Sequence, residues 1–219
     1  NNDIDNDGLC DDGSDPCPND ADNDIDGDGV CGDVDECPVD ANDDSDGDGS
    51  CDSDDICPGS DDNADFDGDQ TPDGCDATPF GSVVLDFANV TESSADITYD
   101  SDMDVYGFQF DVSGVSGLGA TSGFGNTQIG GNTVMAFDFS GLFLPAGSGT
   151  LGTLTFDATL DGELLSLSNV FVSGVGGSNI VLDPESNFST ETTPCANADG
   201  DSLCDVDDAC VNDANNDID

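Results

Sequence analysis

The 219-residue sequence contains no lysine, no arginine, no histidine and no tryptophan, whereas it carries 51 aspartate and glutamate residues. No salt bridge between two side chains can therefore form, and the formal charge is −51 at neutral pH. Charges of one sign repel each other over the roughly 10 Å that salt leaves unscreened. Each carboxylate must consequently be hydrated, accept hydrogen bonds or bind a cation from solution.

These absences exclude several functions. Binding to a nucleic-acid backbone or to an anionic membrane surface requires lysine or arginine, and histidine-based catalysis or metal binding is impossible. No apolar run approaches the roughly 20 residues of a membrane span, so we expect no membrane insertion. Acidic pairs such as those of glycosidases could be drawn from Glu92, Glu163 or Glu185, but in so acidic a chain some pair is always present. We expect no enzymatic activity.

The ten cysteines lack the Cys-x-x-Cys spacing that is typical of zinc sites. Disulfides in an oxidising, extracellular compartment are the better interpretation. The sequence shows no signal peptide, and we expect a mature or internal fragment of a secreted chain.

Composition divides the chain into three segments. Residues 1–79 are rich in aspartate and contain one aromatic residue, Phe66. Residues 80–190 are rich in Val, Leu, Phe, Thr, Ser and Gly, and residues 191–219 return to the acidic style. We therefore predict a folded domain between two stretches of one repetitive type.

The acidic stretches share one pattern, in which aspartates fall at positions 1, 3, 5, 9 and 12 of a loop, usually with glycine at position 6. Four of the five loops also carry a cysteine at position 8. The candidate metal ligands are Asp3, Asp5, Asp7 and Asp11 in the first loop; Asp24, Asp26, Asp28 and Asp35 in the second; Asp44, Asp46, Asp48, Asp52 and Asp55 in the third; Asp65, Asp67, Asp69, Asp73 and Asp76 in the fourth; and Asn197, Asp199, Asp201, Asp205 and Asp208 in the fifth.

This spacing predicts calcium binding. A tight loop turns alternate side chains toward one point, and glycine permits the sharp bend. Ca²⁺ takes 6–8 oxygen ligands and tolerates irregular geometry, whereas Mg²⁺ demands a tighter octahedron. Acids outside the loop frame, such as Asp20, Asp22 and Asp43, are candidates for second ions. The alternative is a disordered acidic linker, which would not repeat a spaced motif with a cysteine at a fixed offset.

The pattern resembles the thrombospondin type 3 repeat, whose form is DxDxDGxxDxxD with a nearby Cys-Pro pair. Cys17-Pro18, Cys37-Pro38 and Cys57-Pro58 match that pair, and the resemblance covers roughly 1–79 and 195–219. It implies multiple calcium ions and little hydrophobic core. The sequence departs from the pattern at Ser14, Gly32, Gln70 and Ser202, which affects individual sites. A similar loop occurs in dockerins, but their flanking helical patterns are missing.

Two disulfide arrangements are consistent with the spacing. Pairing within repeats would join 10–17, 31–37, 51–57 and 204–210, leaving 75–195 to tie the ends of the central domain. Pairing between repeats would join 17–31, 37–51, 57–75 and 195–204, leaving Cys10 and Cys210 to pair with adjacent units. The second arrangement is the one that the thrombospondin resemblance implies, and we favour it.

Residues 80–190 are predicted to form a β-sandwich of about seven strands. Large apolar residues occupy alternate positions at Tyr106, Phe108, Phe110 and Val112 and again at Met135, Phe137 and Phe139, and we expect both sets to face the core. Glycine-rich turns separate the runs. The candidate strands are 82–90, 95–100, 105–115, 133–140, 150–158, 165–174 and 179–183.

The segments YGFQFDVSGV, LPAGSGTLGTLTF and SLSNVFVSG resemble bacterial cohesin-like domains over most of 80–185. This resemblance implies a jelly-roll-like sandwich that is used in extracellular scaffolding. The expected fold class is therefore all-β: a cohesin-like β-sandwich flanked by irregular, disulfide-linked calcium repeats with little regular secondary structure.

The chain begins and ends with NNDID, so that Asp217 and Asp219 would open a further loop in the roles of Asp3 and Asp5. Superposing the two ends places Cys210 of one unit 14 residues before Cys10 of the next, the interval from Cys17 to Cys31. We therefore expect copies of the chain to form a linear array, in tandem or head to tail, as a calcium-stabilised extracellular filament or cell-surface scaffold. The alternatives are a cohesin-like adhesion module that binds a surface protein, and a carbohydrate-binding or glycan-coated module, on a calcium-rigidified stalk.

Overall fold

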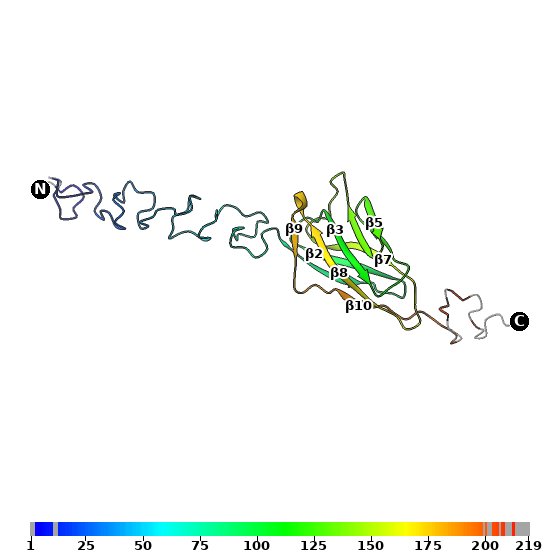
Figure 1. The fold of residues 1–219 in the computed structure, drawn as a ribbon. Coiled ribbons are helices and arrows are strands. Elements are labelled where there is room, and N and C mark those ends of the chain that lie inside the picture. Colours follow the sequence, from blue (N-terminus) through cyan, green and yellow to red (C-terminus); the bar gives the residue numbers. More distant parts are fainter. Residues whose placement is uncertain are drawn as a thin grey trace. The chain divides into compact units, whose positions relative to one another are not determined.

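A computed structural model describes residues 3–10, 13–198, 200, 203–205, 207–208 and 212 (Figure 1). The chain divides into two compact units, Asn1–Pro79 and Phe80–Asp219. The described residues of the first unit form turns and bends without a helix or strand. The second unit contains the β-sandwich and the described residues that follow it.

Ten strands and one short 3₁₀ helix make up the sandwich, which confirms the predicted all-β class. The seven predicted segments all contain a strand. The elements are β1 (Ser82–Ala88), β2 (Ser94–Ser101), β3 (Gly107–Ser113), β4 (Gly119–Ser122), β5 (Asn126–Gly130), β6 (Thr133–Phe137), β7 (Gly147–Thr155), β8 (Leu164–Ser173), η1 (Val175–Gly177), β9 (Asn179–Leu182) and β10 (Ser189–Glu191).

The strands follow one another in the order β4-β7-β2-β1-β9-β8-β3-β6-β5, and β10 pairs with β8. Most neighbours are antiparallel; β1 and β9 pair in parallel and connect the two layers. One layer contains β4, β7, β2 and β1, and the other contains β8, β3, β6 and β5 (Figure 1). The sandwich core lies between them and is built from inward-facing residues such as Leu85, Ile97, Phe110, Leu151 and Leu165, none of which is more than 1% exposed.

The predicted facing of β6 is wrong. Val134 and Ala136 are buried, whereas Met135 is 39% exposed and Phe139, just beyond the strand, is 86% exposed. The reason is the register with β3, which pairs Phe110 with Val134 and Phe108 with Ala136. Paired residues share a face of the sheet, so the small side chains lie inward beside the phenylalanines. Met135 and Phe137 of β6 therefore lie on the outer face.

Three strands were not predicted. The segment 114–126 was expected to be a glycine-rich turn, yet β4 forms within it and pairs with β7. The next strand, β5, pairs with β6 through residues of low β-propensity such as Asn126 and Gly130. Partner strands supply the hydrogen bonds that select these conformations. The third, β10, is only three residues long.

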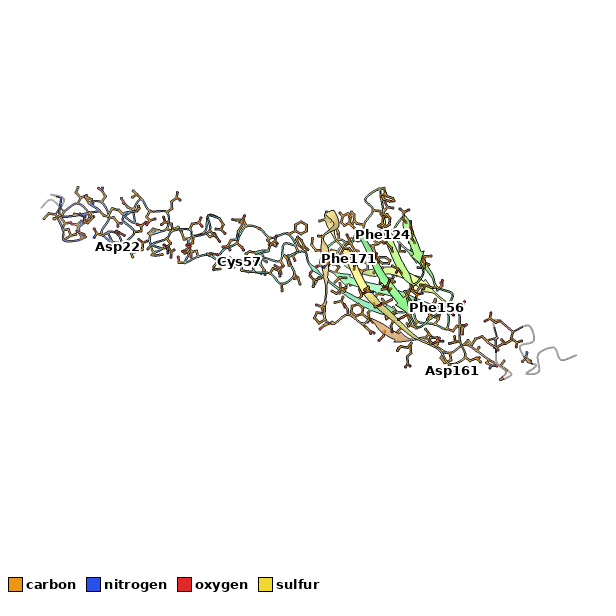
Figure 2. All side chains as sticks on the ribbon, in the orientation of Figure 1. Asp22, Cys57, Phe124, Phe156, Asp161 and Phe171 are labelled. Atoms are coloured by element: carbon orange, nitrogen blue, oxygen red, sulfur yellow. A yellow bond between two sulfur atoms is a disulfide. The ribbon has the colours of Figure 1, made fainter. Side chains whose placement is uncertain are left out.

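The first unit has little apolar interior. Its buried apolar residues among those described are Cys17, Cys37, Cys57 and Pro72, whereas Ile25, Val34 and Ile56 are at least 56% exposed. Figure 2 shows acidic side chains distributed along this unit, with Cys57 among them. Burial of apolar surface therefore supplies little of its stability, and small core-poor modules need disulfides or metals instead. Among the described residues of the whole chain, no helix is long and apolar enough to cross a membrane.

Candidate metal centres

The second to fifth acidic loops wind around the side chain at their first position. In the second loop, Asp24 Oδ1 accepts the N–H of Gly27 at 2.7 Å, and Oδ2 accepts the N–H of Gly29 at 3.1 Å. The third and fourth loops repeat both contacts, through Asp44 with Gly47 and Gly49 and through Asp65 with Gly68 and Gln70. In the fifth loop, Asn197 Oδ1 accepts the N–H of Gly200 at 2.7 Å.

The winding requires positive φ at two positions of each of the first four loops. Position 6, where the sequence predicts glycine, has φ of 104° at Gly29 and 101° at Gly49. Position 4, for which the loop pattern predicts no glycine, has φ of 82° at Gly27. Only glycine adopts such values readily. Gln70 occupies position 6 of the fourth loop with φ of 76° and is therefore strained.

This winding brings the acids at positions 1, 3 and 5 together. In four loops, three carboxylates each offer an oxygen, and the three oxygens lie within 4.8 Å of one another. These triads are Asp3, Asp5 and Asp7; Asp24, Asp26 and Asp28; Asp44, Asp46 and Asp48; and Asp65, Asp67 and Asp69. Three like charges at this distance repel strongly, and the chain has no basic side chain to neutralise them.

Hydrogen bonds satisfy only part of the first two triads, whereas in the third triad every carboxylate oxygen accepts a backbone N–H. Oδ1 of Asp3, Oδ2 of Asp5 and Oδ2 of Asp26 are buried oxygens without a hydrogen-bond partner. A buried carboxylate oxygen without a partner is unfavourable because its hydration has been lost. A cation at the centre of the triad would satisfy these oxygens and remove the repulsion. The donor set is made of hard oxygens, which fits Ca²⁺ and excludes a preference for soft metals.

The acids at positions 9 and 12 have a different role among the described residues. At position 9, Asp52 and Asp73 accept the backbone N–H of Ser45 and Phe66, each at 2.8 Å. At position 12, Asp35 and Asp55 accept the N–H of the cysteine two residues later, at 2.8 and 2.7 Å. Asp76 accepts the N–H of Thr78 in the same way, at 2.8 Å. These carboxylates close the loop backbone. Oδ2 of Asp52 also accepts the hydroxyl proton of Ser45 at 2.7 Å, whereas Oδ2 of Asp76 is buried without a hydrogen-bond partner and could bind a ligand.

The first loop closes with an acid that the 12-residue frame missed. Asp15 is 6% exposed and accepts the N–H of Cys17 at 2.8 Å, which is the contact that Asp35 makes to Cys37. Ser14, the residue at position 12, instead donates its hydroxyl proton to the carbonyl of Cys10. The loop contains one extra residue. The shared Asp-x-Cys-Pro spacing could have identified Asp15.

A further cluster joins the second and third loops. Asp28, Asp35 and Asp43 each offer an oxygen within 4.8 Å. Loss of hydration and the carboxylates of Asp35 and Asp28 raise the pKa of Asp43. At the corresponding place between the first two loops stands Asn23, which donates its Nδ2 proton to Asp7 Oδ2 at 2.7 Å and lowers the pKa of Asp7.

In the third loop, hydrogen bonds from backbone N–H groups lower the pKa of two carboxylates, in contrast to the raised pKa of Asp43. The N–H groups of Gly49 and Gly47 lower the pKa of Asp44, and the N–H of Asp62 lowers the pKa of Asp48.

Asp20, a candidate for a second ion, accepts the N–H of Asp33 at 3.1 Å and is in none of the described clusters. Asp22 is likewise outside them.

The disulfides follow the arrangement between repeats. They join Cys17 to Cys31, Cys37 to Cys51, Cys57 to Cys75 and Cys195 to Cys204, with Cα–Cα distances of 5.5 to 5.7 Å. Pairing within repeats is therefore wrong. Cys10 is exposed and forms no disulfide within the chain, and Cys210 lies outside the described residues. Four disulfides indicate an oxidising compartment such as the extracellular space.

The fifth loop is described in part. The carboxylate of Asp205 accepts the N–H of Ala198 at 2.7 Å, as position 9 does in the earlier loops. Asp208 is 9% exposed. The predicted ligands Asp11, Asp199, Asp201, Asp217 and Asp219 lie outside the described residues.

No protein-family model matches the sequence, and no curated protein matches it either. Several solved structures are similar to part of the chain. A non-cellulosomal cohesin from the archaeon Archaeoglobus fulgidus is 12% identical, with a TM-score of 0.36, over 51% of this chain and 89% of its own.

Two further structures come from Clostridium perfringens and Pyrococcus furiosus. The first, a cohesin module of a family 33 glycoside hydrolase, is 15% identical over 52% of this chain and 95% of its own, with a TM-score of 0.34. The second, a chitin-binding domain of a chitinase, is 19% identical over 46% of this chain and 97% of its own, with a TM-score of 0.29. The assignment of this chain as a β-sandwich rests on its own strand pairing.

Proposed function

We propose that this chain is a calcium-stabilised structural protein of the extracellular space, the repeating subunit of a filament or cell-surface scaffold. The observation that carries the proposal is the set of four carboxylate triads, which lack both a basic partner and a hydrophobic core beneath them. Calcium would neutralise each triad and hold the loop around it. Metal binding and ordering of the repeats would then be one event.

Calcium fits the loops better than other cations do. A triad of aspartates, the carbonyl at position 7 and the acid at position 12 together approach the 6–8 oxygen ligands that Ca²⁺ prefers. Eight of the ten cysteines are held in the four described disulfides and are not available as thiolate ligands. The clusters differ among themselves, and the Asp28–Asp35–Asp43 cluster offers a second type of site between repeats.

Assembly into an array is supported by the disulfide pattern. Cys31 and Cys51 stand at position 8 of their loops and are each bonded to a cysteine 14 residues earlier. Cys10 stands at the same position of the first loop and is exposed. We propose that it bonds to Cys210 of a neighbouring copy, which would continue the same disulfide ladder from one copy to the next.

Electron microscopy and non-reducing electrophoresis of the native material test this proposal. We expect filaments in calcium that fray in EGTA, and covalent multimers that a Cys10→Ser variant loses. A monodisperse monomer at all calcium concentrations would refute the array. Filaments that resist EGTA while atomic absorption finds no bound calcium would refute the role of the metal.

A binding module is the second candidate, and one observation favours it. The outer face of β3, β6 and β8 carries a groove of about 210 Å³ that is lined by Tyr106, Gln109, Met135, Phe137 and Phe171. Phe171 is 41% exposed and points outward from β8 (Figure 2). Exposed aromatic patches of this kind are typical of protein or carbohydrate contacts. The test compares the wild type with a Phe171→Ala variant on columns of immobilised polysaccharides and surface-protein fractions. If the variant is retained as strongly as the wild type on every column, the groove does not have this role.

A further inference from the structure

Two sequences in the chain have the form that accepts an N-linked glycan, Asn89-Val90-Thr91 and Asn187-Phe188-Ser189. Such a sequence is meaningful when it lies in a surface loop of a protein from an oxidising compartment. Asn89 lies in the loop between β1 and β2, and Asn187 lies between β9 and β10. Both residues are exposed, as are Thr91 and Ser189. The structure therefore supplies the context that the short motifs by themselves lack.

Both asparagines lie on the outer face of the same layer. Asn89 Nδ2 donates to Asp96 Oδ2 at 2.7 Å, and Asn187 Nδ2 donates to Asp86 Oδ1 at 3.2 Å. Asp86 follows the buried Leu85 on β1, and Asp96 lies between two residues of β2 that are 0% exposed. The alternation of the strands thus turns both aspartates, and the asparagines beside them, toward solvent.

We propose that Asn89 and Asn187 are N-glycosylated, so that one outer face of the sandwich, that of β1 and β2, carries carbohydrate. The donor is a lipid-linked oligosaccharide phosphate. The asparagine Nδ2 attacks the first sugar at C1, the C1–O bond to the phosphate breaks, and one amide proton leaves with the phosphate. The modified nitrogen keeps one N–H, which is enough to preserve the hydrogen bond to Asp96 or Asp86. The proposal stands independently of calcium binding.

The surface next to Asn187 suits a sugar. A groove of about 440 Å³ runs over β1, β2 and β7 and combines apolar and polar groups; it is lined by Val84, Asp86, Thr98, Tyr99, Asp100, Ser148 and Gly149. Carboxylates accept hydrogen bonds from sugar hydroxyls, and side-chain hydroxyls both donate and accept them, so no basic residue is required. A glycan on Asn187 starts beside Asp86 and therefore at the margin of this groove. The aromatic face of the other layer carries neither of the two sequons and would remain uncovered.

The chain contains a matched control for Asn89. Asn169 on β8 is exposed, has the same φ of 49°, and donates its Nδ2 proton to Asp111 at 2.7 Å. A valine follows each asparagine, but the third residue is Thr91 in one case and Phe171 in the other. The two sites share their φ value, exposure and a carboxylate partner, and they differ in the hydroxyl that the glycosyltransferase requires. Asn169 should therefore remain unmodified.

Peptide mass spectrometry of the protein purified from its native source tests the proposal. Glu-C and chymotrypsin replace trypsin, because the chain contains no lysine or arginine. We expect glycopeptides that contain Asn89 and Asn187, and release of the glycan by an amidase in H₂¹⁸O should leave ¹⁸O-labelled aspartate at both positions. Recovery of both peptides only at their unmodified masses would overturn the proposal. Equal labelling of Asn169 would also overturn it, since that would indicate spontaneous deamidation.

A variant made in the native host separates the motif from the fold. Ser189→Ala removes an exposed hydroxyl at the end of the second sequon and leaves Asn187 in place. We expect the glycan on Asn187 to disappear while that on Asn89 stays. Unchanged glycopeptides at both sites in Ser189→Ala would show that modification does not follow the sequon.

Discussion

Substitution of one triad aspartate by asparagine should weaken calcium binding at one loop and leave the others unchanged. Asp26→Asn is the cleanest choice. Asp26 Oδ1 accepts the N–H of Asp28 at 3.1 Å, and an asparagine keeps this contact. Oδ2 is the buried oxygen without a hydrogen-bond partner. The substitution replaces it by an NH₂ group, which cannot bind a cation.

The expected magnitude follows from the role of charge in calcium sites. Affinities of comparable loops range from about 10⁻⁹ to 10⁻³ M, depending on ligand charge and rigidity. Loss of one carboxylate of the three should therefore raise the dissociation constant about 10- to 100-fold, which corresponds to about 1.4–2.7 kcal/mol. Removal of one negative charge also slightly reduces the long-range repulsion within the unit, which stabilises the loop and offsets a small part of the lost affinity.

The disulfides provide a separate readout for each loop. Cys31 lies in the second loop and is bonded to Cys17, so ordering of that loop should protect this bond from reductant. The assay measures the rate of reduction by dithiothreitol at a series of free calcium concentrations, with alkylation and mass spectrometry of each cysteine pair. In Asp26→Asn, the calcium midpoint for Cys17–Cys31 should rise about 10- to 100-fold, while that for Cys57–Cys75 should stay in place.

Asp33→Asn is the matched control. Asp33 is exposed, lies in the same loop and is in none of the described carboxylate clusters. The Asp33→Asn substitution removes the same charge as Asp26→Asn without removing a candidate metal ligand. Equal shifts in the two variants would show that calcium acts by general screening over the roughly 8 Å of physiological salt. Protection of Cys17–Cys31 that does not depend on calcium would refute the role of the triad altogether.

Three further predictions concern other parts of the chain. Phe110→Ala, at a position 1% exposed in the core, should destabilise the sandwich by about 3–5 kcal/mol in urea unfolding, whereas Phe139→Ala, at a position 86% exposed, should change it little; equal losses would contradict the facing given for β6. Gln70→Gly should relieve the strain at φ of 76° by about 1 kcal/mol and lower the calcium midpoint for protection of Cys57–Cys75, and a higher midpoint would argue against strain. Hydrogen bonds from Asn169 and Thr133 lower the pKa of Asp111 below its ordinary 3.8, so they stabilise the fold above that pH, and this stabilisation is lost as the pH falls through the lowered pKa. Asn169→Ala should therefore reduce the melting temperature near neutral pH but not in strong acid. An equal reduction at both pH values would attribute the effect to packing.

Strand positions in the sandwich could be predicted because apolar residues alternate along them, but strand facing could not always be. In β3, Phe108 and Phe110 are large and apolar while Gln109 is polar, so one face is distinct. In β6, Val134 and Ala136 alternate with Met135 and Phe137, and all four of these residues are apolar. The pattern within such a strand is compatible with either face. Only the pairing with β3, a contact between distant segments, determines which side is buried.

In the acidic loops, contacts within one repeat could be predicted from the sequence, whereas contacts between repeats could not. The triads at positions 1, 3 and 5 follow from the sequence because a single turn, wound on the first carboxylate, brings them together. Asp43 could be named as a candidate but not placed, since its partners Asp28 and Asp35 belong to the preceding repeat. The contrast with Asn23, whose amide donates to Asp7 at the equivalent junction, has a physical consequence. The first junction is held by a neutral donor within the chain, whereas the second joins three carboxylates, whose repulsion a bound cation would offset. Removal of calcium should therefore loosen the junction between the second and third loops before the junction between the first and second.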